Sequence, residues 1–440
     1  MTGGALEAGN GHPSRDSVPG LRRGGIQVLI SNLGANVLGL ASGICMARAL
    51  GSSGRGLYQY AALYWALVPG ISCLSLGTLI AADARAGPSS LSWYRRSAIR
   101  FTVIGVVVAP IMWLVGPLRW PMVLVLALGA PGYMTSDLAQ GRLRQRGMFD
   151  RLSWFRWIDM GGSSVLIVGL FVSGHLTVLT ATVALVATTV VASGGSVSGL
   201  GLRRNAPRPH VERGTVGLVH GSTLLRVLTS WTDQLTVGIL LGQAALGVYA
   251  VAGSMAAQFA VLPAAIATIG FKASQKDESD GGRRLVASLR ITAWAAVGGI
   301  GITAVVGPGF FDVVFGREFR SAGYIAAPLV VSAGLAGMLM VMETYLISLQ
   351  HAGLAIRGRL WSLLGLAVTV PFVVLTRSII VAVAIPVFMN GLPCLVDGRR
   401  LQVLGALRVR DVLKPPSVGE ASTFVREVGA WGRAALRGRR

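Results

Sequence analysis

Charge is scarce in this sequence of 440 residues, of which only 13% are charged whereas 52% are apolar. An average soluble domain carries roughly 25% charged residues. A chain so poor in charge lacks the polar surface that a soluble globular protein of this length needs. The composition therefore predicts a membrane protein.

Cysteine and lysine are scarce as well. Cys45, Cys73 and Cys394 lie in apolar segments without CxxC spacing, so we expect small core residues and not a disulfide or metal set. None of the three lysines follows a glycine, which excludes a Walker A nucleotide loop, and the five histidines lack metal-ligand spacing. We therefore expect no catalytic residue, no metal and no cofactor, and we do not expect an enzyme.

Apolar residues gather instead into long segments. Cutting the sequence at charged residues, glycine and proline leaves about twelve segments near the roughly 20 residues that cross a bilayer as a helix. They are 26–47, 57–81, 101–117, 121–140, 154–173, 176–199, 216–241, 246–270, 291–306, 324–349, 360–376 and 378–396. The pattern predicts an all-α membrane protein.

The net charge of +22 is distributed unevenly between the segments. With the N-terminus inside, 32 of the 40 lysines and arginines fall on the inner side and 6 on the outer side. This asymmetry follows the positive-inside rule, so we expect a multi-pass protein of the cytoplasmic (inner) membrane with both termini cytoplasmic. The same distribution speaks against binding of nucleic acid and favours contact with membrane lipids.

Both ends of the sequence differ from the apolar part. Residues 1–25 are polar and rich in glycine, proline and serine, which predicts a disordered cytoplasmic tail. Residues 397–440 predict a basic cytoplasmic tail. Within it, Glu420 to Arg437 places Phe424, Val428 and Trp431 on one helical face, so we expect an amphipathic helix on the inner leaflet.

One short motif occurs twice. The pattern Leu-Gly-x4-Gly-x-Tyr-x-x-Ala covers residues 50–61 and again residues 241–252, 191 positions later. Each copy lies between two apolar segments, which indicates a glycine turn between two membrane helices and not a phosphate loop. The sequence therefore predicts two similar halves.

Other matches extend the repeat with a changed offset. Asp137 corresponds to Glu343 at an offset of 206, and we assign the additional 15 residues to a loop from Phe310 to Tyr324. These matches predict an N-terminal six-helix lobe over 26–199, a cytoplasmic linker over 200–215 and a C-terminal six-helix lobe over 216–396. Both lobes would surround a central cavity.

Three motifs together resemble a known family. They are Ala47-Arg48-x-Leu50-Gly51-x4-Gly56-x-Tyr58, Thr232-Asp233-Gln234-Leu235 before the second repeat, and Phe315-Gly316-x-x-Phe319. In this order they resemble the polysaccharide flippases of the multidrug/oligosaccharidyl-lipid/polysaccharide (MOP) exporter superfamily. The resemblance implies two lobes with alternating access and a polyprenyl-pyrophosphate-linked saccharide as substrate. It also suggests glycosyltransferases and a polymerase of the same pathway as partners.

Polar residues inside the segments are the candidates for substrate binding, because they are costly in hydrocarbon. The candidates are Arg226, Arg48, Asn32, Asn36, Ser230 and Asp233. Arg226 lies on the same helical face as Asp233, so it either binds the pyrophosphate or balances this acid. Arg48 lies at the outer end of the first segment and either faces the cavity or extends to the lipid headgroups.

Four further ionisable residues are candidates for gating or ion coupling: Asp137, Glu343, Asp159 and Arg156. We expect Asp137 to pair with Arg142 or Arg144, and Glu343 to pair with Arg357 or Arg359. Asp159 and Arg156 lie three residues apart and can neutralise each other.

Two other functions agree less well with the sequence. A cation-coupled multidrug exporter of the same superfamily is the alternative, but such exporters usually carry a carboxylate in the first segment, whereas Ile26 to Ala47 contains no acid. A membrane glycosyltransferase or polymerase would need a large outer loop with catalytic carboxylates. The largest outer loop expected here, 307–323, contains only Asp312 and Glu318.

Overall fold

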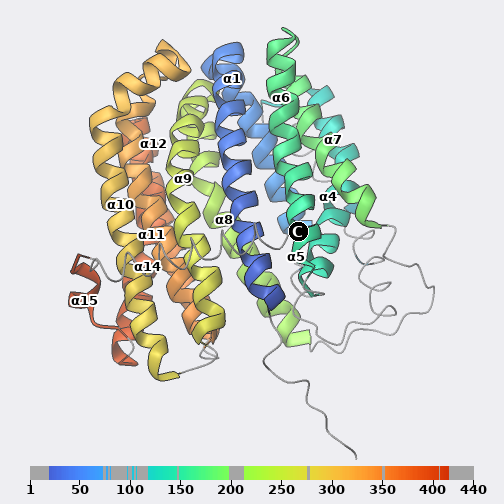
Figure 1. Ribbon diagram of the computed structural model, residues 1–440. Coiled ribbons are helices and arrows are strands. Elements are labelled where there is room, and N and C mark those ends of the chain that lie inside the picture. Colours follow the sequence, from blue (N-terminus) through green and yellow to red (C-terminus); the bar gives the residue numbers. More distant parts are fainter. Residues whose placement is uncertain are drawn as a thin grey trace, which may run out of the picture.

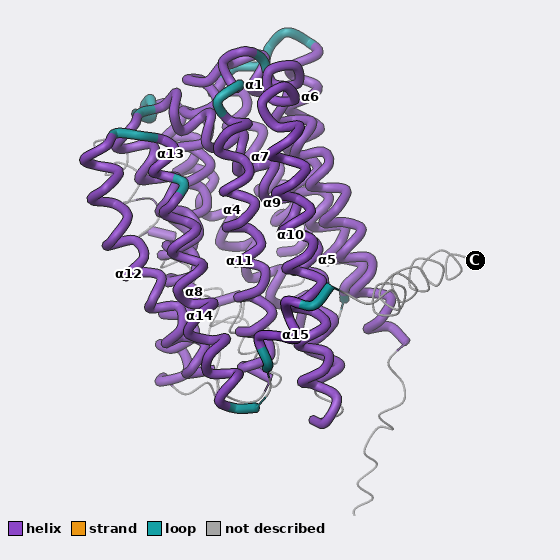
Figure 2. The backbone as a smooth tube through the Cα atoms, turned by 90° about the vertical axis from the view of Figure 1, so that its left-hand side faces the viewer, coloured by secondary structure: helices purple, strands orange, loops and turns teal. Residues whose placement is uncertain are grey.

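The computed structural model describes residues 19–72, 76–77, 80, 97, 102–103, 106, 117–145, 148–197, 213–274, 278–348, 352–405 and 407–415. All regular elements in these residues are helices, and no strand occurs among them (Figure 2). The long helices run side by side as one bundle (Figure 1). The expected all-α fold is confirmed.

The N-terminal half begins with the long helical element α1. Its elements are α1 (Pro19–Ser72), α4 (Trp120–Gln145), α5 (Phe149–Arg156), the π-helix η1 (Trp157–Gly161), α6 (Gly162–Val172) and α7 (Val178–Val197). Non-helical backbone at Gly51 divides α1 into two helices, which match the first two predicted segments. Helices α5, η1 and α6 follow each other directly and cover the fifth segment.

The C-terminal half repeats this plan. Its elements are α8 (Arg213–Leu241), α9 (Gln243–Ser274), α10 (Glu278–Phe315), the 3-10 helix η2 (Arg317–Phe319), α11 (Ala322–Ser348), α12 (Ala352–Thr376), α13 (Ile379–Ala382), α14 (Ala384–Val403) and α15 (Val409–Leu413). Helix α15 is held on α10, because Arg290 Nε donates to the carbonyl of Asp411 and Trp294 Nε1 to that of Lys414.

Six helical stretches among the described residues are long and apolar enough to cross a membrane. They are Trp120–Leu143, Arg151–Val172, Leu285–Val305, Ala322–Leu346, Ile356–Thr376 and Ile379–Val403. Large apolar side chains are exposed on several of them, such as Leu128, Val305 and Leu375. Exposure of this extent on parallel helices fits a surface that faces lipid.

Several helix boundaries differ from the sequence-based expectation. Helix α10 continues through Pro308 to Phe315, so the expected loop from Phe310 to Tyr324 is largely helical. Helix α14 continues past 396 to Val403, and α1 already begins at Pro19. The expected segment ended before Gly307-Pro308, although α10 continues through this pair, and the added ends of α1 and α14 contain charged residues that interrupt the apolar pattern. Residues 200–212 of the expected linker, most of the third segment and the amphipathic helix from Glu420 to Arg437 lie outside the described residues, whereas residues 213–215 already belong to α8.

Both repeat motifs form the turns that the sequence predicts. Gly51 has φ of +67° and Gly242 has φ of +90°, a region of backbone conformation that side chains other than glycine rarely adopt. Each glycine lets the chain reverse between two long helices. We name the end of the bundle that carries Gly51 and Gly242 the repeat-turn end.

The second glycine of each motif joins the two halves. A Cβ atom on Gly56 would lie 1.8 Å from the carbonyl oxygen of Gln243, and one on Gly247 would lie 1.9 Å from that of Ser52. Ser52 and Gln243 are themselves repeat-equivalent, so the contact is reciprocal, as in a two-fold interface. Only glycine permits this approach of α1 to α9.

The main core surrounds this contact and draws on both halves. Tyr60, Tyr64, Leu246 and Tyr249 are buried where α1 meets α9, and they belong to one apolar cluster that extends into α4, α10 and α11. Phe311, Phe315 and Phe319 continue the cluster at the repeat-turn end and are each 1% exposed. The two lobes therefore share one core there.

Substituting Gly56 or Gly247 with Ala should destabilise the protein, because a methyl group would overlap the partner backbone. We expect a loss of roughly 5 °C or more in the thermal unfolding midpoint of the purified protein in detergent. Gly253→Ala in α9 is the matched control, because a Cβ atom there meets nothing within 4 Å. Equal stability of all three variants would contradict the crossing.

Candidate functional site

Arg48 connects the two lobes at the repeat-turn end. Its Nε donates to the carbonyl of Val314 at 2.8 Å and its Nη2 to that of Val313 at 2.7 Å. These carbonyls belong to the last turn of α10, where a helix has unsatisfied acceptors and partial negative charge. Arg48 therefore caps a helix of the opposite lobe, and its expected role toward the cavity or the lipid headgroups stays a prediction.

A second contact lies beside it. The backbone amide of Ser52 donates to Glu318 Oε2 at 2.8 Å. Ser52 opens the second helix within α1, so the carboxylate sits at a helix N-terminus, where negative charge is stabilised. This hydrogen bond lowers the pKa of Glu318 below its ordinary value of 4.5. The contacts of Arg48 and Glu318 together form what we name the interlobe latch.

A chain of polar side chains lies next to the glycine crossing. Arg55 Nη1 donates to Gln59 Oε1 at 3.3 Å, and Gln59 Nε2 donates to Gln234 Oε1 of the opposite lobe at 2.7 Å. Arg55 is only 6% exposed, and its guanidinium lies 5.3 Å from the ring centroid of Tyr58. Sequence reasoning missed this chain, because it assigned Arg55 to a turn and gave the two glutamines no partner.

Asp233 is buried, and its Oδ2 accepts a hydrogen bond from Tyr249 at 2.6 Å. Its Oδ1 has no hydrogen-bond partner among the described residues. Tyr249 is the tyrosine of the second repeat motif, so this pair ties α8 to α9. The side chain of Arg226, earlier on α8, lies outside the described residues, and its pairing with Asp233 stays a prediction.

The smaller binding candidates lie on α1 and α8. Asn36 is partly buried on α1, and Ser230 is exposed on α8. The side chain of Asn32 lies outside the described residues. The structure thus places these residues on the two expected helices without bringing Asn36 and Ser230 into a hydrogen bond with each other.

Glu343 forms the predicted ion pair. Arg359 Nε lies 2.5 Å from its Oε1 and Arg359 Nη2 lies 3.0 Å from its Oε2, a two-pronged geometry that joins α11 to α12. Both side chains are largely buried. Of the two arginines that the sequence offered, the structure selects Arg359.

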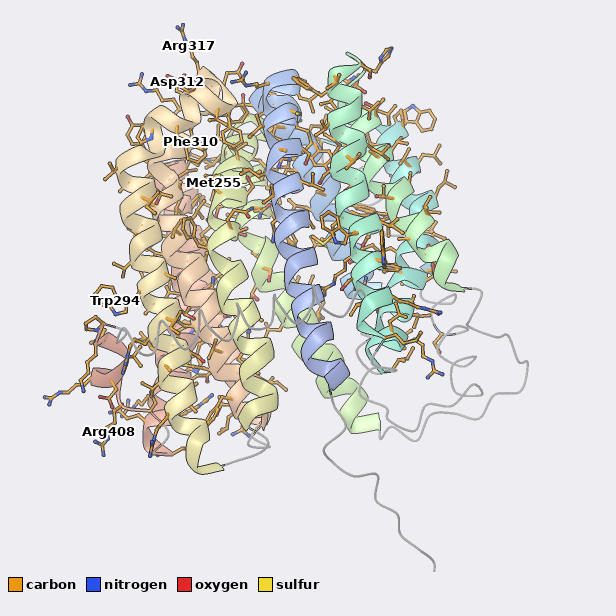
Figure 3. The ribbon with its side chains drawn as sticks, in the orientation of Figure 1. Met255, Trp294, Phe310, Asp312, Arg317 and Arg408 are labelled. Carbon is orange, nitrogen blue, oxygen red and sulfur yellow. The ribbon has the colours of Figure 1, made fainter. Side chains whose placement is uncertain are left out.

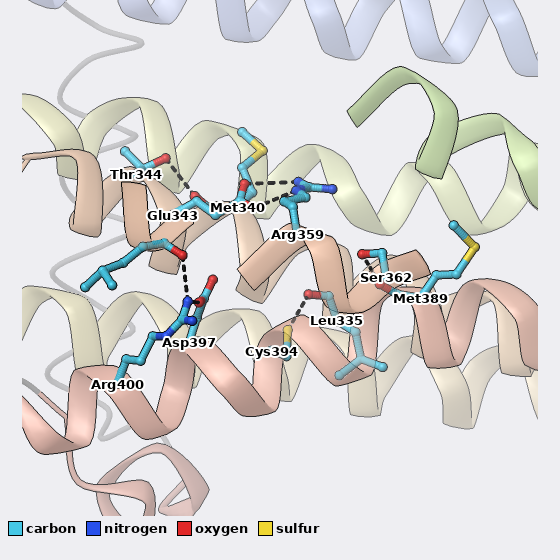
Figure 4. Close-up of polar contacts among 11 residues, drawn as sticks. Leu335, Met340, Glu343, Thr344, Arg359, Ser362, Met389, Cys394, Asp397 and Arg400 are labelled. Carbon is cyan, nitrogen blue, oxygen red and sulfur yellow. Dashed lines mark hydrogen bonds and ion pairs between the residues drawn. The ribbon is translucent and has the colours of Figure 1, made fainter. Parts of the chain in front are cut away.

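A second ion pair, which the sequence did not predict, lies beside the first (Figure 4). Asp397 of α14 is fully buried, and its Oδ1 accepts from Arg400 Nη1 at 3.1 Å. The same nitrogen donates to the carbonyl of Leu354 at 2.6 Å and so ties α14 to α12. The sequence reasoning assigned Asp397 to the tail and therefore overlooked it.

Asp137 and Asp159 join helices within the N-terminal lobe, and the expected pairing of Asp137 with Arg142 or Arg144 stays a prediction. Asp137 Oδ2 accepts from the backbone amide of Gly77 at 2.9 Å, although it is the repeat equivalent of Glu343. Asp159 Oδ1 accepts from Thr189 at 2.7 Å and ties η1 to α7, and Arg156 lies one helical turn before it. These two acids therefore hold helices of one lobe together.

No group of three or more His, Cys, Asp or Glu side chains that could hold a metal occurs in the described part of the chain. The site consists of hydrogen-bonded polar groups between two lobes and of ion pairs inside one lobe. Such an arrangement can bind, orient and gate a solute, and none of these contacts forms a nucleophile with a base.

Solved structures of known proteins share this architecture. The lipid II flippase MurJ in an inward closed conformation superposes with a TM-score of 0.71 at 11% identity, over 93% of this chain and 97% of that one. An inward-facing MATE multidrug resistance transporter of the MOP superfamily gives 0.63 at 14% identity, over 88% and 98%. The chain has the fold of the MOP superfamily transporters.

A further similar structure is a MOP superfamily transporter from Pyrococcus furiosus, described as having a binding pocket of reverse polarity. It gives a TM-score of 0.61 at 14% identity, over 89% of this chain and 96% of that one. No family model and no curated protein matches the sequence. The likeness therefore concerns the MOP fold, with two lobes and multiple membrane helices.

The interlobe latch should depend on pH. The lowered pKa of Glu318 means that the latched state is favoured above the ordinary pKa of 4.5 and loses this contribution as pH falls through the lowered value. Spin labels at Ser53→Cys and Arg317→Cys, in a background with the three cysteines replaced by Ala, should report a distance at pH 7 that lengthens as the pH is titrated down through the lowered pKa of Glu318.

Glu318→Ala should give the long distance at both pH values, because no carboxylate is left to titrate. Arg320→Ala removes an exposed charge on the same side and should behave like the parent protein. A pH response that persists in Glu318→Ala would assign the effect to another group.

Proposed function

We propose that the protein moves a polyprenyl-pyrophosphate-linked saccharide across the cytoplasmic membrane by alternating access. In this proposal both termini are cytoplasmic and the repeat-turn end faces outward. We keep the division into tail, lobe, linker, lobe and tail that was made from the sequence, over 1–25, 26–199, 200–215, 216–396 and 397–440. Helices α1, α8 and α14 extend beyond these bounds to Pro19, Arg213 and Val403. Glycosyltransferases and a polymerase of the same pathway would supply and use the substrate.

One observation carries the proposal: the close, reciprocal contacts that join the lobes gather at one end. Three contacts lie near the repeat-turn end: the crossing of Gly56 and Gly247, the interlobe latch and the Gln59–Gln234 hydrogen bond. A solute between the lobes would therefore enter from the opposite, cytoplasmic end. Separation of these contacts would open the outer side, which is the movement that alternating access requires.

The polar residues near the interface favour an anionic headgroup. Helix α1 contains no acid between Ile26 and Ala47, where Asn32 and Asn36 provide neutral donors and acceptors. Arg226 on α8 provides a guanidinium, which binds phosphate oxygens by two parallel hydrogen bonds. The fold likeness to a lipid II flippase supports a lipid-linked substrate.

A cation-coupled multidrug exporter is the second candidate, and one observation favours it. Asp233 is a buried carboxylate with a free Oδ1 among the described residues, and such a group could bind a coupling ion. The fold likeness to MATE transporters agrees with this alternative. Both candidates share the two-lobe movement and differ in the solute.

Reconstitution of the purified protein into lipid vesicles distinguishes the flippase from the multidrug exporter. Purified protein in vesicles should make a fluorescent polyprenyl-pyrophosphate disaccharide of the inner leaflet accessible to external dithionite, whereas a fluorescent phosphatidylcholine should stay protected. Ethidium uptake driven by a sodium or proton gradient should be absent. Ethidium transport without flipping of the pyrophosphate lipid would reverse the assignment in favour of the exporter.

Arg226 is expected to hold the pyrophosphate. Arg226→Ala should reduce flipping at least about tenfold, because a phosphate that leaves water needs fixed positive charge, and Arg226→Lys should retain part of the activity. Arg320→Ala is the matched control for loss of a positive charge. All variants are compared in the same vesicles at equal protein content.

The double variant Arg226→Ala with Asp233→Asn decides between two roles. The amide introduced by Asp233→Asn keeps an acceptor for the Tyr249 hydroxyl but removes the negative charge. If Arg226 only balances Asp233, the double variant should regain the activity that Arg226→Ala loses, since no unpaired buried charge remains. Continued loss of activity supports contact with the substrate.

A further inference from the structure

A groove lies between α12 and α14, away from the interface of the two lobes. Its volume is about 410 Å³. It is lined by four aliphatic and two arginine side chains: Leu354, Val396, Val403, Leu404, Arg399 and Arg400. None of these residues belongs to the latch or to the polar chain described above.

The groove lies at the end of the bundle opposite the repeat-turn end. Arg377 follows the last residue of α12 and donates to the carbonyl of Leu240, which lies close to Gly242 at the repeat-turn end. Helix α12 therefore ends at the repeat-turn end and begins at the opposite end of the bundle. Helix α14 starts shortly after Arg377 and runs back, so it ends at that opposite end as well. Figure 3 shows Arg317 and Arg408 at these opposite ends. In the proposed topology the groove is at the level of the inner leaflet.

The guanidinium of Arg400 is held in place by hydrogen bonds to the protein itself. Only its Nη1 donates to described residues, to the carbonyl of Leu354 and to Asp397, which fixes the plane of the guanidinium. Nε and Nη2 make no hydrogen bond within the described part of the chain. Arg399 is exposed and has no hydrogen bond or ion pair with a described residue. Two adjacent guanidinium groups thus border one groove.

The wall of the groove is suited to hydrocarbon. Val396, Arg399, Arg400, Val403 and Leu404 recur at intervals of three and four along α14 and its C-terminal end and therefore form one stripe. Val403 is 82% exposed and the neighbouring Leu395 is 73% exposed, which indicates that this side of α14 faces lipid. A soluble anion would gain nothing from these aliphatic side chains, whereas a lipid would bind with both its headgroup and its chain.

We propose that this groove binds an anionic phospholipid of the inner leaflet, with its phosphate between Arg399 and Arg400 and one acyl chain along Val403 and Leu404. The membrane surface on the cytoplasmic side is rich in such lipids. Guanidinium groups recognise phosphate by charge-assisted hydrogen bonds. The inference rests on the proposed topology and is independent of the transported solute.

The test uses the full-length protein in a neutral detergent. Phosphatidylglycerol should raise its thermal unfolding midpoint in a saturable way, whereas phosphatidylcholine with the same acyl chains should not. Arg399→Gln, an exposed position, should weaken the apparent affinity for phosphatidylglycerol about tenfold while leaving the midpoint without lipid unchanged. Arg317→Gln removes the same charge at the opposite end and should bind like the parent protein.

Two outcomes would overturn the proposal. If Arg399→Gln and Arg317→Gln bind phosphatidylglycerol with equal affinity, the groove is not the lipid site. If glycerol 3-phosphate stabilises the protein as strongly as phosphatidylglycerol, the arginines bind a soluble phosphate and the acyl chain plays no part. Neither of these two results would contradict the proposed flippase function, because flipping is measured in a separate experiment.

Discussion

The approach of α1 to α9 at Gly56 and Gly247 is the contact on which the rest of the structure depends. Backbone atoms of the two lobes meet there without intervening side chains, so neighbouring groups come within hydrogen-bonding distance. Arg48 reaches the end of α10, the Ser52 amide reaches Glu318, and Gln59 reaches Gln234. Any larger residue at the crossing would move all of these partners apart.

The two repeat copies share a backbone but not their side-chain chemistry. Arg55 of the first copy corresponds to Leu246 of the second, and both are buried beside the crossing. Tyr58 lies against Arg55, whereas its equivalent Tyr249 donates to Asp233. The repeat therefore makes the backbones of the two lobes similar. The polar groups that differ between the copies make the side-chain chemistry of the two lobes different.

The sequence predicted what depends on local pattern. The apolar segments, the glycine turns and the repeat could be predicted because each is defined by a pattern of nearby residues. The ion pair of Glu343 with Arg359 could be predicted because the two residues lie at the neighbouring ends of consecutive helices. The helix end at Phe315 was missed because Gly307-Pro308 interrupts the apolar segment without ending the helix, and the end at Val403 was missed because the last turns of α14 are charged. Arg48, Gln59 and Asp397 were assigned no correct partner, since their partners lie far away in sequence or in a stretch assigned to the tail.

The ion pairs of the C-terminal lobe have an electrical consequence. Glu343, Arg359, Asp397 and Arg400 carry two negative and two positive charges within one cluster of α11, α12 and α14. Moving a single charge through a membrane potential of 100 mV involves roughly 2.3 kcal/mol. A neutral cluster that moves as a body performs no such work, so the membrane potential exerts no net force on it. Voltage dependence of lobe movement would have to arise from charges outside this cluster, including those of the bound solute.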